Sequence, residues 1–346
     1  MTAPLVSVLT AVRDGARFIP QTIASIRAQT VQDWEYIIVD DASEDGTVAL
    51  VERAAEEDPR IRLLRRATRG GPYVAANDGL AVARGRYVAR IDSDDVAPPN
   101  RLELQLGFLS ERPDLRACGG LQRRIGPTGE LFPDVWRVPV QPGVLRWRLC
   151  FAADPPHSSA FVERSAFEEI GGYAPLPLAQ DWRLWCELSR RDWLGIVSEV
   201  VVYRRVHGDR LTEREAPRQD EFGSDVAREH IQMLSNEEWS LDDVRLLRRV
   251  VRRQSAPFRE GLRVVDRWAR LWRSDESLTA AEREELAVWT SRLKRDHVRR
   301  WGEALPVAGP IVRLGRHADA ALRRVGSTAR RFPRRQGRTS PDALDR

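Results

Sequence analysis

The sequence predicts an α/β protein: a mostly parallel sheet covered by helices on both faces, followed by a helical extension. Two observations lead to this prediction. Over the first hundred residues, short apolar runs alternate with stretches in which apolar residues recur at helical spacing. Beyond about residue 210, the chain becomes charged, helical in pattern and rich in tryptophan and paired arginines.

The alternating region contains four expected strands and the helices between them. The strands fall at residues 5–9, 36–39, 61–64 and 87–91, and the helices at 18–26, 48–55 and 74–83. Ligands of such sheets bind beyond the carboxyl ends of the strands. Polar clusters follow three of these strands, at residues 10–14, 40–43 and 92–95. We expect these clusters to converge on one crevice.

The rest of the chain sets the predicted domain boundaries. Between residues 98 and 203 the pattern is mixed, with helices expected at 100–112, 164–170 and 181–190 and a strand at 197–202. A Gly/Pro-rich stretch at 119–143 has no readable motif. We predict a catalytic domain at 1–210, a helical extension at 211–328 and a disordered basic tail at 329–346.

Composition favours a cytoplasmic protein that does not bind nucleic acid. The net charge is +5, but ten arginines against four acidic residues in 301–346 account for it. The three cysteines lie far apart, as expected for reduced thiols. No signal peptide and no apolar run of membrane-spanning length is expected. The single lysine, Lys294, indicates a bacterial genome of high GC content.

The acidic cluster Asp92-Ser93-Asp94-Asp95 follows the fourth expected strand. Two carboxylates at the end of a buried strand offer the oxygen ligands that Mg²⁺ or Mn²⁺ prefers. The alternative is a solvated acidic turn that caps the helix beginning near Pro98-Pro99. Its place after a strand in a β/α series favours the metal site.

Other polar residues allow both a functional and a structural interpretation. Asp40 and Asp41 could accept hydrogen bonds from a nucleobase or ribose, while Ser43 or Asp45 could simply cap the next helix. Asp181, at a helix start, is either a cap or a general base. The residues Arg204, Arg205 and His207 could meet a phosphate or metal, or could form a basic surface turn. His157 alone is a weaker signal.

Taken together, residues 4–10, 25–30, 34–43 and 85–95 resemble the motifs of family 2 inverting glycosyltransferases with the GT-A fold, which is Rossmann-like. The resemblance covers residues 4–210, and it implies a role for each matching position. The nucleotide would be bound by Thr10, Asp41 and Asp92, and the divalent metal (Mn²⁺ or Mg²⁺) by Asp94 with Asp92 beside it. Asp181 would be the catalytic base. His157 and Ser158 would lie on the acceptor side, and His207 would contact the diphosphate or the metal.

Two departures from the family pattern affect these roles. Arg13 and Asp14 stand where the family often has Tyr-Asn-Gly, so either could alter base preference and uracil does not follow from the family pattern; Asp14 is also a nucleotide-binding candidate. Gln180 replaces the glutamate that usually precedes the base. The chain also lacks the Gln-x-x-Arg-Trp element and the membrane helices of processive synthases, which favours a single-transfer enzyme.

The resemblance implies transfer of a sugar from a nucleotide-diphosphate-sugar, with a UDP-sugar favoured, to a glycan or lipid-linked acceptor in cell-envelope synthesis. One alternative is a phosphate-transfer enzyme, although its Asp-x-Asp motif normally follows the first strand. The other is an inactive scaffold that binds partners. The mixed apolar and arginine-rich segment 304–324 could lie on the inner face of an anionic membrane, or could be a packed helix followed by a solvated tail.

Overall fold

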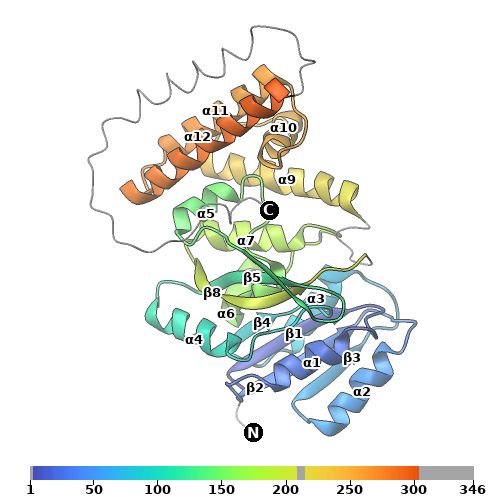
Figure 1. Ribbon diagram of the computed structural model, residues 1–346. Helices are drawn as coiled ribbons and strands as arrows, with labels where there is room; N and C mark the ends of the chain where they lie inside the picture. Colours follow the sequence, from blue (N-terminus) through green and yellow to red (C-terminus); the bar gives the residue numbers. More distant parts are fainter. Residues whose placement is uncertain (1–2, 209–214, 304–346) are drawn as a thin grey trace. The chain divides into compact units, whose positions relative to one another are not determined.

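The computed structural model describes residues 3–208 and 215–303 of the 346-residue chain. Contacts divide the chain into two compact units, one ending at Glu237 and one beginning at Glu238 (Figure 1). The segment 304–324 and the tail 329–346, for which membrane contact and disorder were predicted, lie outside the described residues.

In the described part of the first unit, eight strands form one sheet. They are β1 (Val6–Val12), β2 (Trp34–Asp40), β3 (Ile61–Arg65), β4 (Tyr87–Arg90), β5 (Ala117–Ile125), β6 (Leu131–Trp136), β7 (Phe161–Glu163) and β8 (Leu194–Arg205). The order is β3-β2-β1-β4-β7-β5-β6, and β8 pairs with β5. Strands β1 to β4 are parallel, as predicted, whereas β7 runs antiparallel to β4 and β5 runs antiparallel to β7 and β6.

Helices cover both faces of the sheet. The described helices of this unit are α1 (Ile19–Arg27), α2 (Thr47–Glu57), α3 (Pro72–Val82), α4 (Arg101–Glu111), α5 (Pro142–Arg148), α6 (Arg164–Ile170), α7 (Gln180–Arg190) and α9 (Ala216–Ser235), which packs on α7, with a short 3₁₀ turn η1 (His157–Ser159). Residues of α1, α2 and α4 join one core with the even-numbered residues of β1 and β2. On the other face, Gly79 of α3 packs on Leu9 and Val39. The predicted α/β class is confirmed.

The stretch 119–143, in which the sequence showed no motif, contains strands β5 and β6. Its glycines serve close packing. A Cβ on Gly119 would lie 2.1 Å from Cγ of Pro155, and one on Gly120 would lie 2.5 Å from Cγ2 of Val201. The small residues that hide the strand pattern therefore let β5 pack closely against two other segments.

A second close approach gives a test of the sheet packing. A Cβ on Gly85 would lie 2.4 Å from the Ser7 nitrogen, whereas Gly107 in α4 has open space around it. Because backbone cannot yield as a flexible side chain does, Gly85→Ala should lower the free energy of unfolding by about 1–3 kcal/mol. Gly107→Ala should raise it by about 0.5–1 kcal/mol through helix propensity. Urea denaturation measures both, and shifts of the same sign would contradict the packing described here.

The second unit contains α10 (Leu241–Val251), α11 (Phe258–Arg273) and α12 (Ala280–Glu303). Its core gathers aliphatic side chains around an aromatic cluster, in which the Trp268 ring lies 5.5 Å from that of Trp289 and 6.4 Å from that of Trp272. Of the described helices, none combines the length and apolar character that crossing a membrane requires.

Candidate active site

Three loops meet at the carboxyl ends of β2, β1 and β4, which are neighbours in the sheet. The amide of Asp14 donates to the Ser43 hydroxyl (2.9 Å), and the Asp14 carboxylate accepts from the Glu44 amide (2.8 Å). From α1, the Thr22 hydroxyl reaches the carbonyls of Ser93 and Asp95 at 2.9 and 2.8 Å. The predicted convergence of the three polar clusters is therefore confirmed.

Asp41 is buried at the end of β2 in a cradle of donors. Its two carboxylate oxygens accept from the backbone amides of Gly70 and Gly71 at 2.7 and 2.8 Å. The Nε atom of Arg66 lies 3.0 Å from one of these oxygens. The cradle fixes the carboxylate at the edge of the crevice where β2 and β3 end.

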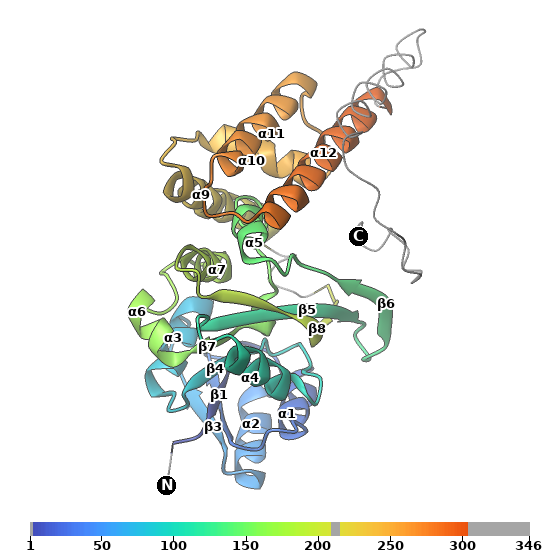
Figure 2. The same cartoon turned by 90° about the vertical axis from the view of Figure 1, so that its left-hand side faces the viewer.

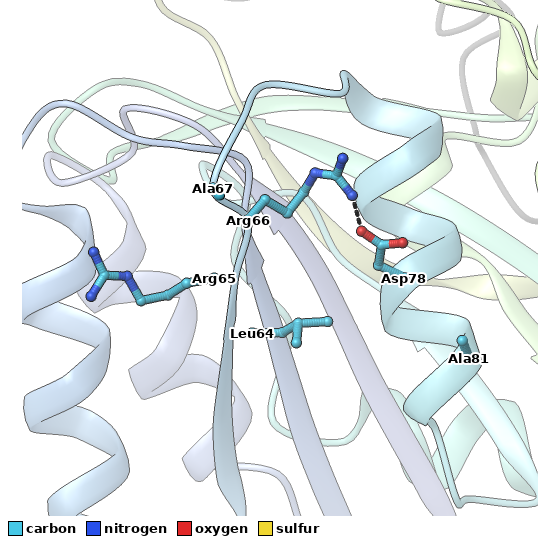
Figure 3. Close-up of a pocket in the computed structure, with 6 residues that line it drawn as sticks. All are labelled: Leu64, Arg65, Arg66, Ala67, Asp78 and Ala81. Atoms are coloured by element: carbon cyan, nitrogen blue, oxygen red, sulfur yellow. Dashed lines mark hydrogen bonds and ion pairs between the residues drawn. The ribbon is translucent and has the colours of Figure 1, made fainter.

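Arg66 also borders a cavity of about 370 Å³ beside the end of β3 (Figure 3). The cavity is lined by Leu64, Arg65, Arg66, Ala67, Asp78 and Ala81. Figure 3 shows the Arg66 guanidinium extending from β3 to pair with Asp78 on α3. One guanidinium thus joins the Asp41 cradle to the helix on the other side of the cavity.

Thr10 and Asp14 occupy different environments. Thr10 is fully buried, and its hydroxyl lies 2.8 Å from both the Tyr36 hydroxyl and the Ile91 carbonyl. The structure therefore does not bring this side chain to the crevice surface. Asp14 is exposed, with positive φ of 51°, and stands at the rim.

Asp92 belongs to a closed ring of four polar side chains. Its Oδ1 atom lies 3.4 Å from Arg90 Nη2 and 3.4 Å from His157 Nδ1. His157 Nε2 lies 3.0 Å from the Tyr173 hydroxyl, and the positive charge of Arg90 also lies near that hydroxyl. Arg90 and Tyr173 are buried, so only Asp92 faces the crevice with substantial exposure.

The direction of the hydrogen bonds in this ring follows from chemistry. A carboxylate only accepts, so the hydrogen of a neutral His157 ring is favoured on Nδ1 beside Asp92, and Nε2 accepts from the Tyr173 hydroxyl. Burial raises the pKa of Tyr173 far above its ordinary value, which keeps that proton in place. The neutral imidazole must then carry its hydrogen on Nδ1, facing the Asp92 carboxylate.

Tyr173→Phe is expected to open this ring. It leaves His157 Nε2 without its buried donor, which should lower the free energy of unfolding by about 1–3 kcal/mol. Nitrogen NMR should show the Nδ1–H tautomer of His157 in the native chain and a mixture in the variant. Tyr87→Phe, at the opposite end of β4, is the matched control. An unchanged His157 spectrum in Tyr173→Phe would refute the assigned ring.

Asp95 and Asp94 point in different directions. Asp95 is buried, and its carboxylate accepts from the Ser158 hydroxyl (2.5 Å) and the Arg205 amide (2.9 Å). The Ser158 hydroxyl in turn accepts from the Asp92 amide at 3.1 Å. Asp95 thus holds the acidic loop against η1 and β8, and Asp94 is left to face His207.

Asp94 and His207 form the clearest pair of potential metal ligands. The Asp94 Oδ2 atom lies 2.9 Å from His207 Nε2. The other ring nitrogen, Nδ1, is buried and has no hydrogen-bond partner among the described residues. The ring of His207 lies 4.6 Å from that of Phe18, which fixes its orientation.

A carboxylate oxygen and an imidazole nitrogen suit Mn²⁺ well. Among the described residues, no three histidine, cysteine, aspartate or glutamate side chains are arranged so that they could hold a metal ion together. A hard cation at Asp94 and His207 would thus complete its shell with further oxygens, which fits an ion shared with a diphosphate.

Arg205 has a structural role that the sequence did not suggest. Its guanidinium is buried and donates to the carbonyls of Asp94 (2.8 Å), Gly126 (3.0 Å) and Pro127 (3.1 Å). It also donates to Gln21 at 2.6 Å. These contacts hold the acidic loop in place rather than presenting the charge to a phosphate.

Asp181 lies in the first turn of α7, after Ala179 in the left-handed region (φ 61°). Its Oδ1 atom accepts from the Trp182 amide at 2.8 Å. Trp182 is buried and donates to the Leu149 carbonyl at 2.9 Å, which anchors the turn. No contact between Asp181 and the acidic loop occurs among the hydrogen bonds and ion pairs of the described residues, so its role as base stays a prediction.

An acidic crevice at the carboxyl ends of parallel strands is a usual ligand-binding arrangement of α/β proteins. Comparison with known sequences narrows this class. The profile of "Glycosyl transferase family 2" matches residues 7–171, and this domain belongs to that family. The chain is a glycosyltransferase, as the resemblance implied.

Relatives come from bacterial glycan synthesis. An "Uncharacterized glycosyltransferase" of Haemophilus influenzae is 27% identical over 238 residues, covering 66% of this chain and 73% of that protein. The "Putative teichuronic acid biosynthesis glycosyltransferase TuaG" of Bacillus subtilis is 42% identical over 109 residues, or 32% and 43% of the two chains. Cell-envelope polysaccharide enzymes are thus among the relatives of this domain.

Solved structures confirm the GT-A fold. S. aureus TarS 1-349 in complex with UDP-GlcNAc has a TM-score of 0.54 at 17% identity, covering 86% of this chain and 90% of that one. The mannosyltransferase PcManGT from Pyrobaculum calidifontis, in complex with GDP-Man and Mn²⁺, has a TM-score of 0.52 at 17% identity, covering 86% of each chain.

Proposed function

We propose that this chain is an inverting, non-processive glycosyltransferase of cell-envelope glycan synthesis, acting at the cytoplasmic face of the membrane. It moves a sugar from a nucleoside diphosphate sugar to a hydroxyl of a glycan or lipid-linked acceptor. Residues 1–210 form the catalytic domain, and 211–328 the extension. The observation that carries the proposal is the crevice at the carboxyl ends of β2, β1 and β4, which holds the Asp94–His207 pair.

The donor nucleotide lies across the carboxyl ends of β2, β1 and β4. Asp41, held by two backbone amides, faces the base, and Asp92 faces the ribose. Asp14 at the rim influences which base is preferred, while Thr10 supports the base site from inside the sheet through Tyr36. A UDP-sugar is the favoured donor, in line with the UDP-GlcNAc complex of TarS.

The divalent cofactor, Mn²⁺ or Mg²⁺, is assigned to Asp94 and His207, with Asp92 at the edge of its shell. When bound, the ion supplies positive charge that neutralises the departing diphosphate. The Mn²⁺ in the PcManGT complex supports this choice of ion. Phe18 and Arg205 hold the two ligands in place from behind.

Asp181 is the general base. Its carboxylate accepts the proton of the acceptor hydroxyl as that oxygen forms a bond to the anomeric carbon. The bond from this carbon to the diphosphate oxygen breaks on the opposite face, so the anomeric configuration inverts. His157 and Ser158, which buttress Asp92 and Asp95, form the wall on the acceptor side.

A donor screen tests the proposal. One nucleotide-sugar in the presence of Mn²⁺ should stabilise the chain by about 2.7 kcal/mol at a hundred times its dissociation constant, which thermal unfolding detects. Slow release of the nucleoside diphosphate should accompany it. A chain that binds no nucleotide-sugar in a complete panel would instead support the inactive scaffold, and cleavage of simple phosphate esters would support a phosphate-transfer enzyme.

A further inference from the structure

Large apolar side chains are exposed mainly in one place. Of the seven such side chains in the described residues, four lie between residues 131 and 140: Leu131 (50% exposed), Phe132 (36%), Trp136 (40%) and Val140 (47%). We call these four residues the β6 strip. Strand β6 is the last strand of the sheet order and stands at its outer edge (Figure 2).

The β6 strip is exposed on both faces of its strand. The residues from Leu131 to Asp134, and Trp136 as well, are all exposed, so neither face of this strand is covered within the described residues. A rigid protein partner would cover one face, whereas a fluid apolar phase surrounds both. Pro133 removes one backbone donor from the edge and disfavours pairing with another strand.

Charges around the β6 strip suit an anionic surface. Arg123 and Arg124 on the paired strand and Arg137 at the end of β6 supply three cations. Arg124 lies over the Phe132 ring at 5.3 Å, with an apolar stem beside the strip. Two acidic residues stand nearby, Glu130, which accepts from Thr128, and Asp134, which pairs with Arg124, so the three arginines leave a net charge of +1 around the strip.

The hairpin that carries the β6 strip is fastened to the active site at both ends. At its turn, the carbonyls of Gly126 and Pro127 accept from Arg205, which also holds Asp94. At its base, Trp136 Nε1 donates to the buried Asp154 carboxylate at 3.2 Å. Asp154 stands three positions before His157, so the strip borders the proposed acceptor side.

We propose that the β6 strip inserts into the surface of an anionic phospholipid bilayer. Leu131, Phe132 and Val140 enter the acyl boundary, Trp136 lies at the headgroup level, and the arginines meet lipid phosphates. This contact brings the crevice to an acceptor carried by the membrane. The role in catalysis rests on the proposed function, whereas the lipid contact itself does not.

Co-sedimentation of the full chain with phosphatidylglycerol-rich vesicles tests the proposal. The native chain should pellet with the vesicles, and the double variant Leu131→Ser/Phe132→Ser should partition about tenfold more weakly. The matched control, Met233→Ser/Val288→Ser, alters apolar residues of equal or greater exposure (59% and 63%) and should partition like the native chain. Thermal unfolding checks that all three are folded.

Equal partitioning of the double variant and the control would overturn the proposal, because the contact would then lie elsewhere, as in the segment 304–324. A native chain that stays in solution would overturn it as well. The proposal would also be overturned if the native chain were a dimer and the double variant a monomer, since the strip would then be an interface between two copies. The double variant should still be stabilised by the nucleotide-sugar. This measurement distinguishes failure of the lipid contact from failure of the proposed glycosyl transfer.

Discussion

Asp181→Asn is expected to lower the turnover number for sugar transfer by about 10²–10⁴-fold, the usual contribution of a positioned base. The amide keeps the shape of the side chain but cannot take the proton of the acceptor hydroxyl. The affinity for the nucleotide-sugar should stay unchanged, because Asp181 borders the acceptor side. Steady-state transfer and donor titration by calorimetry measure the two quantities separately.

Asp192→Asn is the matched control for this variant. Asp192 follows the same helix, pairs with Arg146 at the surface, and has a positive φ of 55° that asparagine tolerates. It should retain native turnover. Near-native turnover in Asp181→Asn would remove Asp181 from the role of base, while equal loss in both variants would point to a disturbed helix α7.

Asp94→Ala should weaken donor binding in the presence of Mn²⁺ by about 10- to 100-fold. The substitution removes the carboxylate that faces His207, and with it an oxygen ligand on the rigid loop held by Arg205. With chelator present, the native chain and the variant should bind donor equally, because neither can use the ion. Isothermal titration with Mn²⁺ and with chelator measures the difference.

His207→Gln tests the other member of the same pair. It should lower the affinity for donor in the presence of Mn²⁺ but not in the presence of chelator. Asp114→Ala, an exposed carboxylate beyond α4, should bind donor normally in both conditions. If Asp94→Ala lost affinity by the same factor with chelator present, Asp94 would contact the donor itself rather than a metal ion.

Strands β1, β2 and β4 of the parallel half could be predicted because they are buried on both faces. All seven residues of β2 are buried, and such strands stand out as continuous apolar runs. The antiparallel half could not be predicted in the same way. Strand β5 contains Gly119, Gly120 and two arginines, and β7 has three residues, so neither gives a readable pattern.

The candidate site, like the sheet, could be predicted only in part. The candidate carboxylates could be proposed because each directly follows a strand or opens a helix. The internal contacts of Arg205 and the pairing of Tyr173 with His157 could not be predicted, because the partners lie far apart in the sequence. Tyr173 meets His157 through a loop, and Arg205 meets Asp95 across 110 positions. A buried arginine at a strand end, such as Arg90, was the one available signal, since an arginine in such a place needs internal acceptors.

The contacts between β8 and the acidic loop also determine the order in which parts of the domain fold during protein synthesis. The parallel strands and their helices are complete once about a hundred residues have left the ribosome. The partners of Asp94 and Asp95, however, are His207 and Arg205, which are synthesised more than a hundred positions later. Because long-range contacts form last, a nascent chain brings Asp94 and His207 together only when β8 has docked. Binding of a divalent ion at the proposed Asp94–His207 site would therefore report that the whole domain has folded.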